Sequence, residues 1–234
     1  MQPVTSVEVQ MGDRRGDALP DRVGAVCGIA FTALAVTSVV VVPPPPESDV
    51  AVATVRDYLL SHQGGLSIST AVMGFAAMVV IGFFGLASRR VGEKAGDGGV
   101  ARSAFVVAAT VVVSMTMLGV VLQAALVQQI APAADDSTLS ALYAVWDRVF
   151  HTAPAMGMAV VLISAVAGRR QSRTYPAWLT VTALLAAVLT VIDVAEDLSS
   201  TGSNLGPLGL IAFALSNVWI VATSVRVLTE RHSR

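Results

Sequence analysis

Long runs of apolar residues alternate with short polar connections along almost the whole chain. About 20 consecutive apolar residues in an α-helix cross the roughly 30 Å hydrocarbon layer of a bilayer. Six runs approach that length and leave no stretch for a separate soluble core. The pattern predicts an all-α bundle of six transmembrane helices, a membrane domain over 22–228 with spans at about 23–42, 66–87, 103–127, 149–167, 177–194 and 206–225.

The basic residues are sorted to alternate connections between these runs. Thirteen of the 15 Lys and Arg residues lie in the N-terminal tail, in the connections after the second and fourth runs, or at the C-terminal end. Only Arg56 and Arg148 fall on the other side. Because cytoplasmic connections carry the excess of Lys and Arg, the sequence predicts six crossings with both termini in the cytoplasm. Residues 1–21 and 229–234 are predicted as cytoplasmic tails, the first of them disordered.

The connection between the first and second runs contains a shorter helical pattern. The first run ends in prolines 43–46 rather than at a small-residue cleavage site, which favours a retained anchor over a signal peptide. Residues 47–49 then offer an acidic helix cap, and apolar residues follow at helical spacing over 52–59. With glycines 64–65 expected to end it, the pattern predicts an amphipathic outer helix of about four turns, on the membrane surface or over the bundle mouth.

The amino-acid composition is also the one expected of a membrane-embedded protein. Apolar residues make up 54% of the chain and charged residues 13%, and the mean hydropathy is +0.70. Soluble proteins carry roughly 25% charged residues, so the bilayer is the expected partner. The net charge of −1 gives no indication of nucleic-acid binding. Cys27 is the one cysteine and lies in an apolar run, where it is expected to be a small core residue.

Ionisable residues inside membrane spans are costly and are candidates for functional sites. Here they gather at the outer ends of the fourth and fifth spans. Residues four apart share one face of a helix, as Asp147 and His151 do. The hypothetical ligand or proton pocket comprises Asp147, Arg148, His151, Asp193, Glu196 and Asp197, with Arg56 and His62 of the short helix as its cap.

Two further residues affect this region. Pro154 removes the hydrogen bond to the carbonyl of Phe150 and predicts a kink directly below His151. Asn217 lies near the middle of the sixth span, where an interhelical hydrogen bond is expected.

The polar cluster has three interpretations. In the structural one, Arg148 forms an ion pair with Asp193, Glu196 or Asp197 and ties the two helices together. In the second, the cluster lines a cavity that binds a ligand or conducts protons. In the third, His62, His151 and Asp193 converge on a metal ion, although no metal-binding motif is present.

The small numbers of histidine and lysine residues argue against several classes of cofactor. The chain has three histidines, which argues against haem held by paired histidines. Its one lysine, Lys94, lies in a connection, which argues against a retinal protein. The glycine-rich turn at 96–99 lacks the lysine and the preceding strand of a nucleotide-binding loop. No metal and no cofactor is therefore predicted.

The outline resembles that of an uncharacterised family of small six-helix membrane proteins common in high-GC actinobacteria. The points of likeness are Arg22-Val23-Gly24 at the start of an Ala/Val-rich span, the Pro-rich outer segment with its short helix, and the arginine pairs 89–90 and 169–170. The likeness covers most of residues 22–228. It implies a bacterial plasma-membrane protein and assigns no catalytic residue.

The sequence thus predicts a membrane protein with an outer-facing polar pocket between the fourth and fifth helices, for a small or lipid-like ligand or for proton coupling. Two other functions stay open. One is a non-catalytic accessory subunit that docks a membrane-protein partner or a second copy of the chain. The other is a metal-dependent hydrolase embedded in the membrane.

Overall fold

The structure, a computed structural model, describes residues 18–46, 50–92, 99–172, 176–199 and 207–229. Within these residues the fold is all-α, as predicted. The six long helices that match the predicted spans are α2 (Ala18–Val40), α4 (Gln63–Gly92), α5 (Val100–Ala125), α8 (Ala153–Ser172), α9 (Ala177–Ser199) and α10 (Pro207–Thr229). The shorter elements are α3 (Val52–Ser61), α6 (Ala131–Ala133), α7 (Asp136–Asp147) and two π-helical turns, η1 (Leu126–Ile130) and η2 (Arg148–Thr152).

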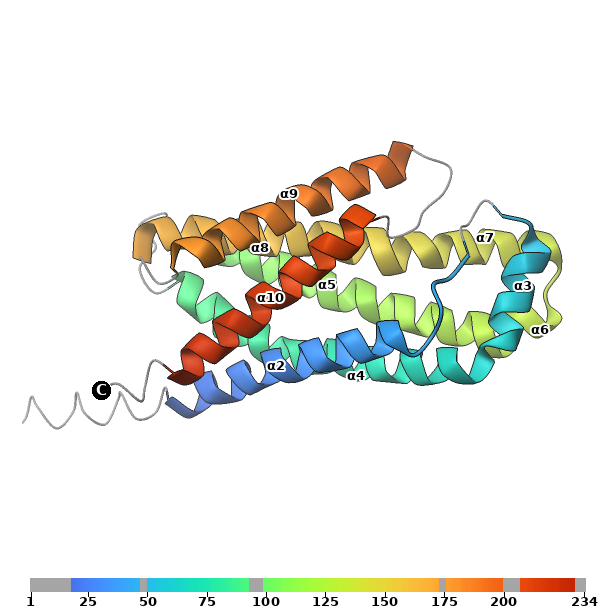
Figure 1. The fold of residues 1–234 in the computed structure, drawn as a ribbon, viewed down its shortest axis with the longest axis horizontal. Coiled ribbons are helices and arrows are strands. Elements are labelled where there is room, and N and C mark those ends of the chain that lie inside the picture. The colour runs from blue at the N-terminus through green and yellow to red at the C-terminus, as the bar shows by residue number, and fades with distance from the viewer. Residues whose placement is uncertain (1–17, 47–49, 93–98, 173–175, 200–206, 230–234) are drawn as a thin grey trace, which may run out of the picture.

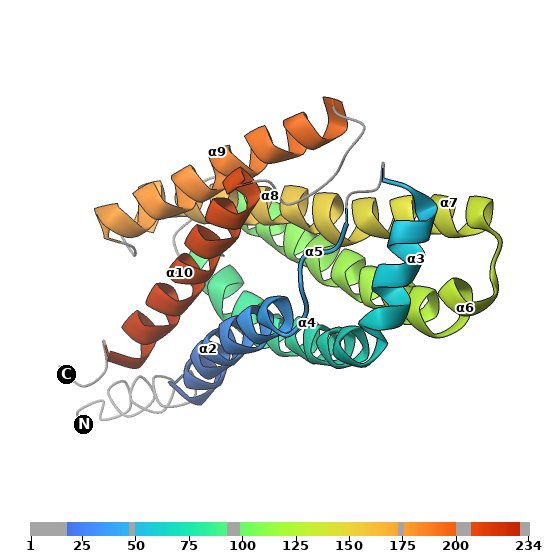
Figure 2. The same ribbon diagram turned by 45° about the vertical axis from the view of Figure 1, so that its right-hand side comes forward.

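The six long helices form a closed ring in chain order. Each packs against its neighbours in the chain, and α10 returns to pack against α2 (Figures 1 and 2). Helix α2 begins and α10 ends at the same end of the bundle, which we call the terminal end. The opposite end carries α3, and we call it the α3 end.

The outward faces of the ring are apolar and exposed. Large hydrophobic side chains with about half of their surface open include Val106, Val107, Val121, Ile163, Val181, Leu185, Val188, Ile211 and Val218. Exposure of this extent in water would drive aggregation, whereas lipid tails solvate it. All six helices have the length and apolar composition to cross a bilayer. The chain is therefore a polytopic membrane protein.

Aromatic side chains fill the ring towards the terminal end. Phe83 meets Trp219 edge to face, with the ring centroids 5.8 Å apart, and Phe84 meets Phe105 in the same way at 6.1 Å. All four side chains are buried. Alanines of α5, α8 and α9 let the backbones approach around them. The buried side chains of this part of the ring form its main hydrophobic core.

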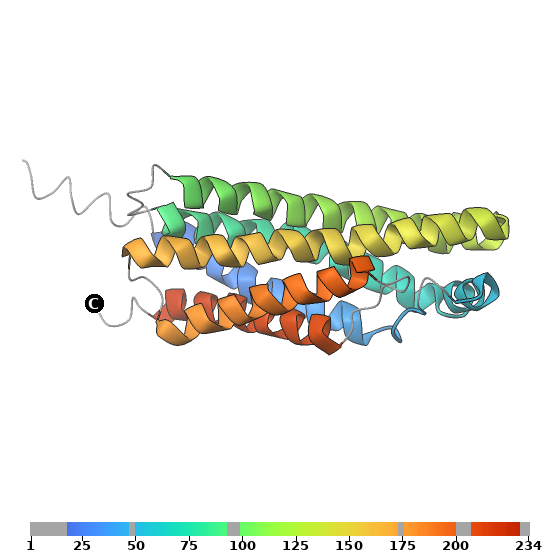
Figure 3. The ribbon, with the colours of Figure 1, turned by 90° about the horizontal axis from the view of Figure 1, so that it is seen from above.

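The two longest spans extend well beyond the bilayer thickness. The third span runs without a break from Val100 to Ala133 and the fourth from Asp136 to Gly168, which are 34 and 33 residues. At 1.5 Å per residue each is roughly 50 Å long, against a hydrocarbon layer of about 30 Å. Figure 3 shows both helices passing beyond the ends of α9 and α10 at the α3 end. There they form a second hydrophobic cluster with α3, to which Val55 and Leu59 contribute buried side chains.

The predicted short helix is present but differs in its limits. It spans the ten residues of α3 rather than about four turns, and its N-cap Ala51 makes no side-chain capping bond. The acidic cap predicted at 47–49 lies outside the described residues. Gly64 and Gly65 do not end the helix, because α3 already stops at Ser61 and α4 begins at Gln63 and includes both glycines.

The N-terminal boundary also differs from the prediction. Helix α2 starts at Ala18, so residues 18–21 are its first turn and not part of a tail. An ion pair accounts for the early start, because Asp21 lies 3.2 Å from Arg89 and 3.8 Å from Arg90 in the last turn of α4. Residues 1–17 and 230–234, predicted as tails, lie outside the described part of the chain.

One glycine allows the closest approach of two spans near the polar cluster. A Cβ atom at Gly119 of α5 would collide with the Phe150 side chain and lie only 3.1 Å from its Cα atom. The backbone of η2 therefore rests directly on α5 at this point. Any side chain at position 119 would push η2 outwards.

We expect Gly119→Ala to lower the free energy of unfolding by about 1–3 kcal/mol, because the clash involves backbone and cannot relax by a rotamer change. Gly85→Ala is the matched control, since a Cβ at Gly85 meets nothing within 4 Å. Unfolding in a graded series of SDS and mild-detergent mixtures measures both. Equal stabilities of the two variants would contradict the close contact.

Candidate functional site

Both π-helical turns lie directly before an Ala-Pro-Ala sequence. Proline has no backbone N–H and cannot bond to the carbonyl four residues earlier. At Pro154 the helix responds with a widened turn, in which the N–H of Ala153 bonds to the carbonyl of Arg148 five residues back. Ala131, before Pro132, bonds in the same way to Leu126. The kink predicted at Pro154 is thus a π turn, and π turns within α-helices occur frequently at functional sites.

The η2 turn holds His151 against a buried carboxylate. His151 Nδ1 lies 2.8 Å from Asp147 Oδ1, and Asp147 is only 3% exposed. The rings of Trp146 and Phe150 meet the imidazole edge to face, at 5.7 and 5.2 Å between centroids. An ionised carboxylate can only accept, so Nδ1 then donates and Nε2 of the neutral ring is left as an acceptor. The face shared by Asp147 and His151, predicted from their spacing, is present.

Arg148 joins η2 to α9. Its Nη1 atom lies 2.5 Å from Asp197 Oδ2 and donates to the Asp197 backbone carbonyl at 2.9 Å. Thr152 adds a hydroxyl that donates to the same Oδ2 at 2.6 Å. Of the three partners predicted for Arg148, the described structure thus pairs it with Asp197. This contact ties the fourth and fifth spans together, as the structural interpretation predicts.

A cavity of about 220 Å³ lies in the middle of the ring, and all six long helices contribute to its wall. Along α10 it extends from Gly209 to Ile220, which is roughly 16 Å. Most of the lining side chains are apolar. Six are polar, and they are Thr116, His151, Thr190, Asp193, Ser216 and Asn217. Of the residues predicted to line a pocket between the fourth and fifth spans, His151 and Asp193 line this mainly apolar cavity.

Asp193 lies towards the α3 end of this cavity, as His151 does. Its carboxylate accepts a hydrogen bond from the backbone N–H of Gly209, in the first turn of α10. No salt bridge of Asp193 occurs within the described residues. Glu196, three residues further along α9, is exposed and does not line the cavity.

Asn217 lies deeper in the same cavity. Its Nδ2 donates to the backbone carbonyl of Phe213 at 2.9 Å, so its predicted interhelical bond is replaced by one within its own helix. This bond also fixes the amide orientation, because only the NH₂ group can donate to a carbonyl. The Oδ1 atom is buried and has no hydrogen-bond partner in the described structure.

Arg56 and His62, the residues predicted to cap the pocket, lie away from the cavity. Arg56 donates to the carbonyls of Ala131 and Ala134, the second at 2.8 Å, and lies 3.0 Å from Asp136, so it closes the end of α6. His62 contacts Tyr58 and Ser61 within its own turn. Neither residue lines the cavity.

Hydrogen bonds to the proline-rich segment hold α3 in place. The Tyr58 hydroxyl donates to the carbonyl of Pro43, and Tyr143 of α7 donates to that of Pro46. Burial raises the pKa of Tyr58 to about 12, so this hydroxyl keeps its proton at neutral pH. Arg56, Tyr58 and Tyr143 therefore hold together the part of the fold that extends beyond α9 and α10.

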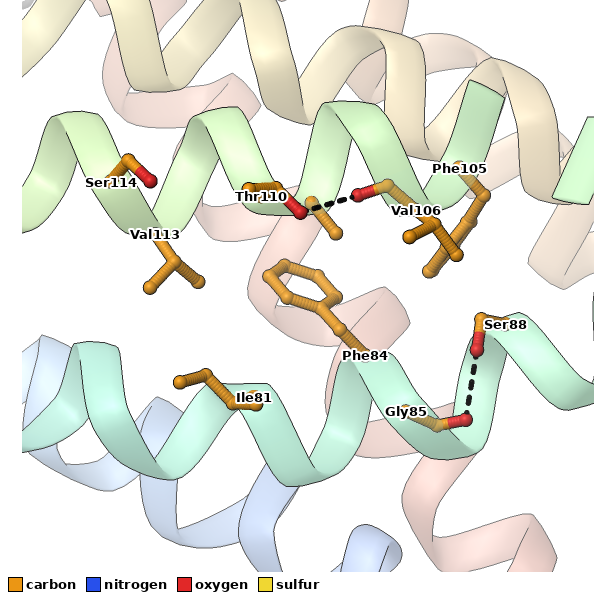
Figure 4. A pocket seen from close by; sticks show the side chains of 10 residues that line it. Ile81, Phe84, Gly85, Ser88, Phe105, Val106, Thr110, Val113 and Ser114 are labelled. Carbon is orange, nitrogen blue, oxygen red and sulfur yellow. Dashed lines mark hydrogen bonds between the residues drawn. The ribbon is translucent and has the colours of Figure 1, made fainter. Parts of the chain in front are cut away.

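Within the described residues, no three His, Cys, Asp or Glu side chains lie close enough to hold one metal ion. The structure brings His151 and Asp193 to one cavity but leaves His62 on α3. A second hollow, of about 290 Å³, lies between α4 and α5 (Figure 4). It contains no charged side chain, and Ser88 and Thr110 donate their hydroxyl hydrogens to carbonyls of their own helices.

Comparison of the chain with models of protein families, with curated proteins and with solved structures gives no match. The resemblance to an actinobacterial family therefore stays a prediction.

We expect Asp197→Asn to lower the free energy of unfolding by about 1–2 kcal/mol. The charge that holds Arg148 is lost, but the Arg148 side chain is 36% exposed and water replaces part of the interaction. Glu196→Gln on the same helix is the control and should leave stability unchanged. SDS unfolding of Arg148→Gln, Asp197→Asn and the double variant measures the pair, and strictly additive effects would contradict a direct ion pair.

Proposed function

We propose that the protein binds a small, mainly apolar molecule with a cationic or hydrogen-bond-donating head group in the central cavity. Ligand sites are typically concave and apolar, with a few convergent polar groups. The cavity has this character, with Asp193 and His151 at one end. Its volume is below the roughly 300 Å³ at which common ligand pockets begin, which favours a compact ligand.

The polar groups of the cavity wall favour a ligand whose head group donates hydrogen bonds over one whose head group only accepts them. The hydroxyls of Thr116, Thr190 and Ser216 donate to carbonyls of their own helices, which uses their one hydrogen and leaves only lone pairs. Asn217 Oδ1 and a neutral His151 also offer lone pairs. A ligand with acceptors alone would find almost nothing to bond to.

Asp193 is the residue on which the proposed binding of a cationic head group depends. Asp193 is partly buried in the cavity wall. A carboxylate that is partly withdrawn from water is costly unless a proton or a cation neutralises it. The carboxylate of Asp193 accepts a hydrogen bond from the backbone N–H of Gly209. No Lys or Arg side chain of the described residues forms an ion pair with this carboxylate. A protonated amine would supply the missing charge and further donors.

We expect the chain to bind hexylamine more tightly than hexanol, and hexanol more tightly than hexanoate. These probes share one apolar tail and differ only in the head group. Calorimetric titration of the protein in lipid nanodiscs, with empty nanodiscs as blank, gives the three affinities. Equal saturable binding of all three would overturn the proposed head-group recognition.

Asp193→Asn should lower hexylamine affinity about tenfold, the effect of losing one charge-assisted hydrogen bond. Asparagine keeps an oxygen that can accept from the Gly209 N–H, so the start of α10 remains capped. Glu196→Gln removes an exposed carboxylate three residues away and should leave affinity unchanged. An equal loss in both variants would indicate a general charge effect and not a site.

We also propose that the protein is a plasma-membrane protein of a bacterium, with its termini in the cytoplasm and α3 on the outer side. The segregation of Lys and Arg supports this orientation. The cavity would then lie in the outer part of the bilayer.

Two single-cysteine variants in a Cys27→Ala background test the orientation. Ser61→Cys on α3 should react with a membrane-impermeant maleimide in intact cells, because the site faces the outside. Thr229→Cys at the end of α10 should react only after permeabilisation. The reverse labelling pattern would place α3 in the cytoplasm.

A further inference from the structure

Asn217 forms part of the wall at the deep end of the cavity and has an acceptor atom without a partner in the described structure. Its side chain is 94% buried, since only 6% of its surface is exposed, and it lines the wall. The bond from Nδ2 to the Phe213 carbonyl occupies the amide nitrogen and leaves Oδ1 without a hydrogen-bond partner. A buried acceptor without a donor costs roughly 1–3 kcal/mol, and a bound polar group would remove that cost.

The two ends of the cavity are separated along α10 by a known number of residues. Asp193 is bonded to Gly209, and Asn217 follows eight residues later on the same helix. Eight residues correspond to about 12 Å. Most of the side chains in the cavity wall are apolar, and Ala212 and Phe213 of α10 lie between these two levels.

We propose that the ligand of this cavity has a second hydrogen-bond donor at its far end, which binds Asn217 Oδ1. The ligand class is then a slender apolar molecule with a cationic or hydroxyl head at Asp193 and a hydroxyl or amine at the other end. This inference rests on the proposed function, because it presupposes that the head group lies at Asp193. The second contact would make Asn217 the residue that determines which length of ligand the cavity prefers.

A pair of probes with equal numbers of heavy atoms tests the second contact. Heptylamine and 6-amino-1-hexanol carry the same head group and differ in a terminal methyl or hydroxyl group. Asn217→Leu keeps the side-chain size and removes the acceptor. We expect the variant to lose about fivefold in affinity for the amino alcohol, the usual effect of one neutral hydrogen bond, and to bind heptylamine at least as well as the wild type.

Thr223→Val is the control. It removes a buried polar atom of the same helix that does not line the cavity, and it should change neither affinity. A loss in Asn217→Leu that is equal for both probes, or equal to that in Thr223→Val, would overturn the role of Asn217.

The wild type alone gives a second measurement that does not depend on how the variant folds. Amino alcohols with four to eight carbons should show an affinity maximum at one intermediate length, while the matching alkylamines should bind more tightly with each added carbon. A parallel rise in both series would overturn the second contact. If heptylamine still binds and depends on Asp193, the proposed function survives that outcome. If heptylamine shows no saturable binding, the proposed function fails as well.

Discussion

Backbone hydrogen bonding in a medium without water is the constraint on which the rest of this structure depends. A helix in lipid has to satisfy each N–H and carbonyl group within the protein. Pro154 interrupts that pattern inside the fourth span, and η2 restores it by bonding Ala153 to Arg148. The widened turn carries Arg148, His151 and Thr152, three of the side chains that make contacts towards α9 or the cavity. A proline thus shapes the polar region without contributing a polar group.

The cavity exists because small and large side chains are distributed unevenly along the ring. Towards the terminal end, Phe83, Phe105 and Trp219 fill the middle. Towards the α3 end, alanines 35, 77, 155 and 212 face the same axis from four different helices. Six helices in a closed ring cannot all approach the axis, so side chains have to fill it, and alanine is too small to do so.

The architecture could be predicted because its signals are local. Apolar runs of sufficient length give the spans. A local cap of the same kind begins α7, where the Asp135 side chain accepts from the N–H of Thr138. The limits of helices were less predictable, since they depend on distant partners. Helix α2 starts early because Asp21 meets arginines of α4, which no local pattern indicates.

The site was predictable only as far as it lies on one or two helices. The i, i+4 spacing predicted the shared face of Asp147 and His151, and adjacent spans predicted an ion pair between Arg148 and α9. The roles of Arg56 and Asn217 were missed, because both depend on rotamers and neighbours that spacing does not fix. Thr152 and Gly209 were missed as well, since a hydroxyl or a backbone N–H carries no charge to draw attention in a sequence. A proline directly after a polar turn was the signal that could have identified Thr152.

The three aspartates of the polar region differ in the partners that the fold gives their carboxylates. Asp147 has an imidazole and Asp197 a guanidinium and a hydroxyl, so each is paired by a residue of η2. Asp193 faces the cavity, and its assigned hydrogen bond comes from a backbone N–H. Of the three, Asp193 is therefore the one whose charge no ion pair of the described residues neutralises, and a cationic head group in the cavity would supply the opposite charge.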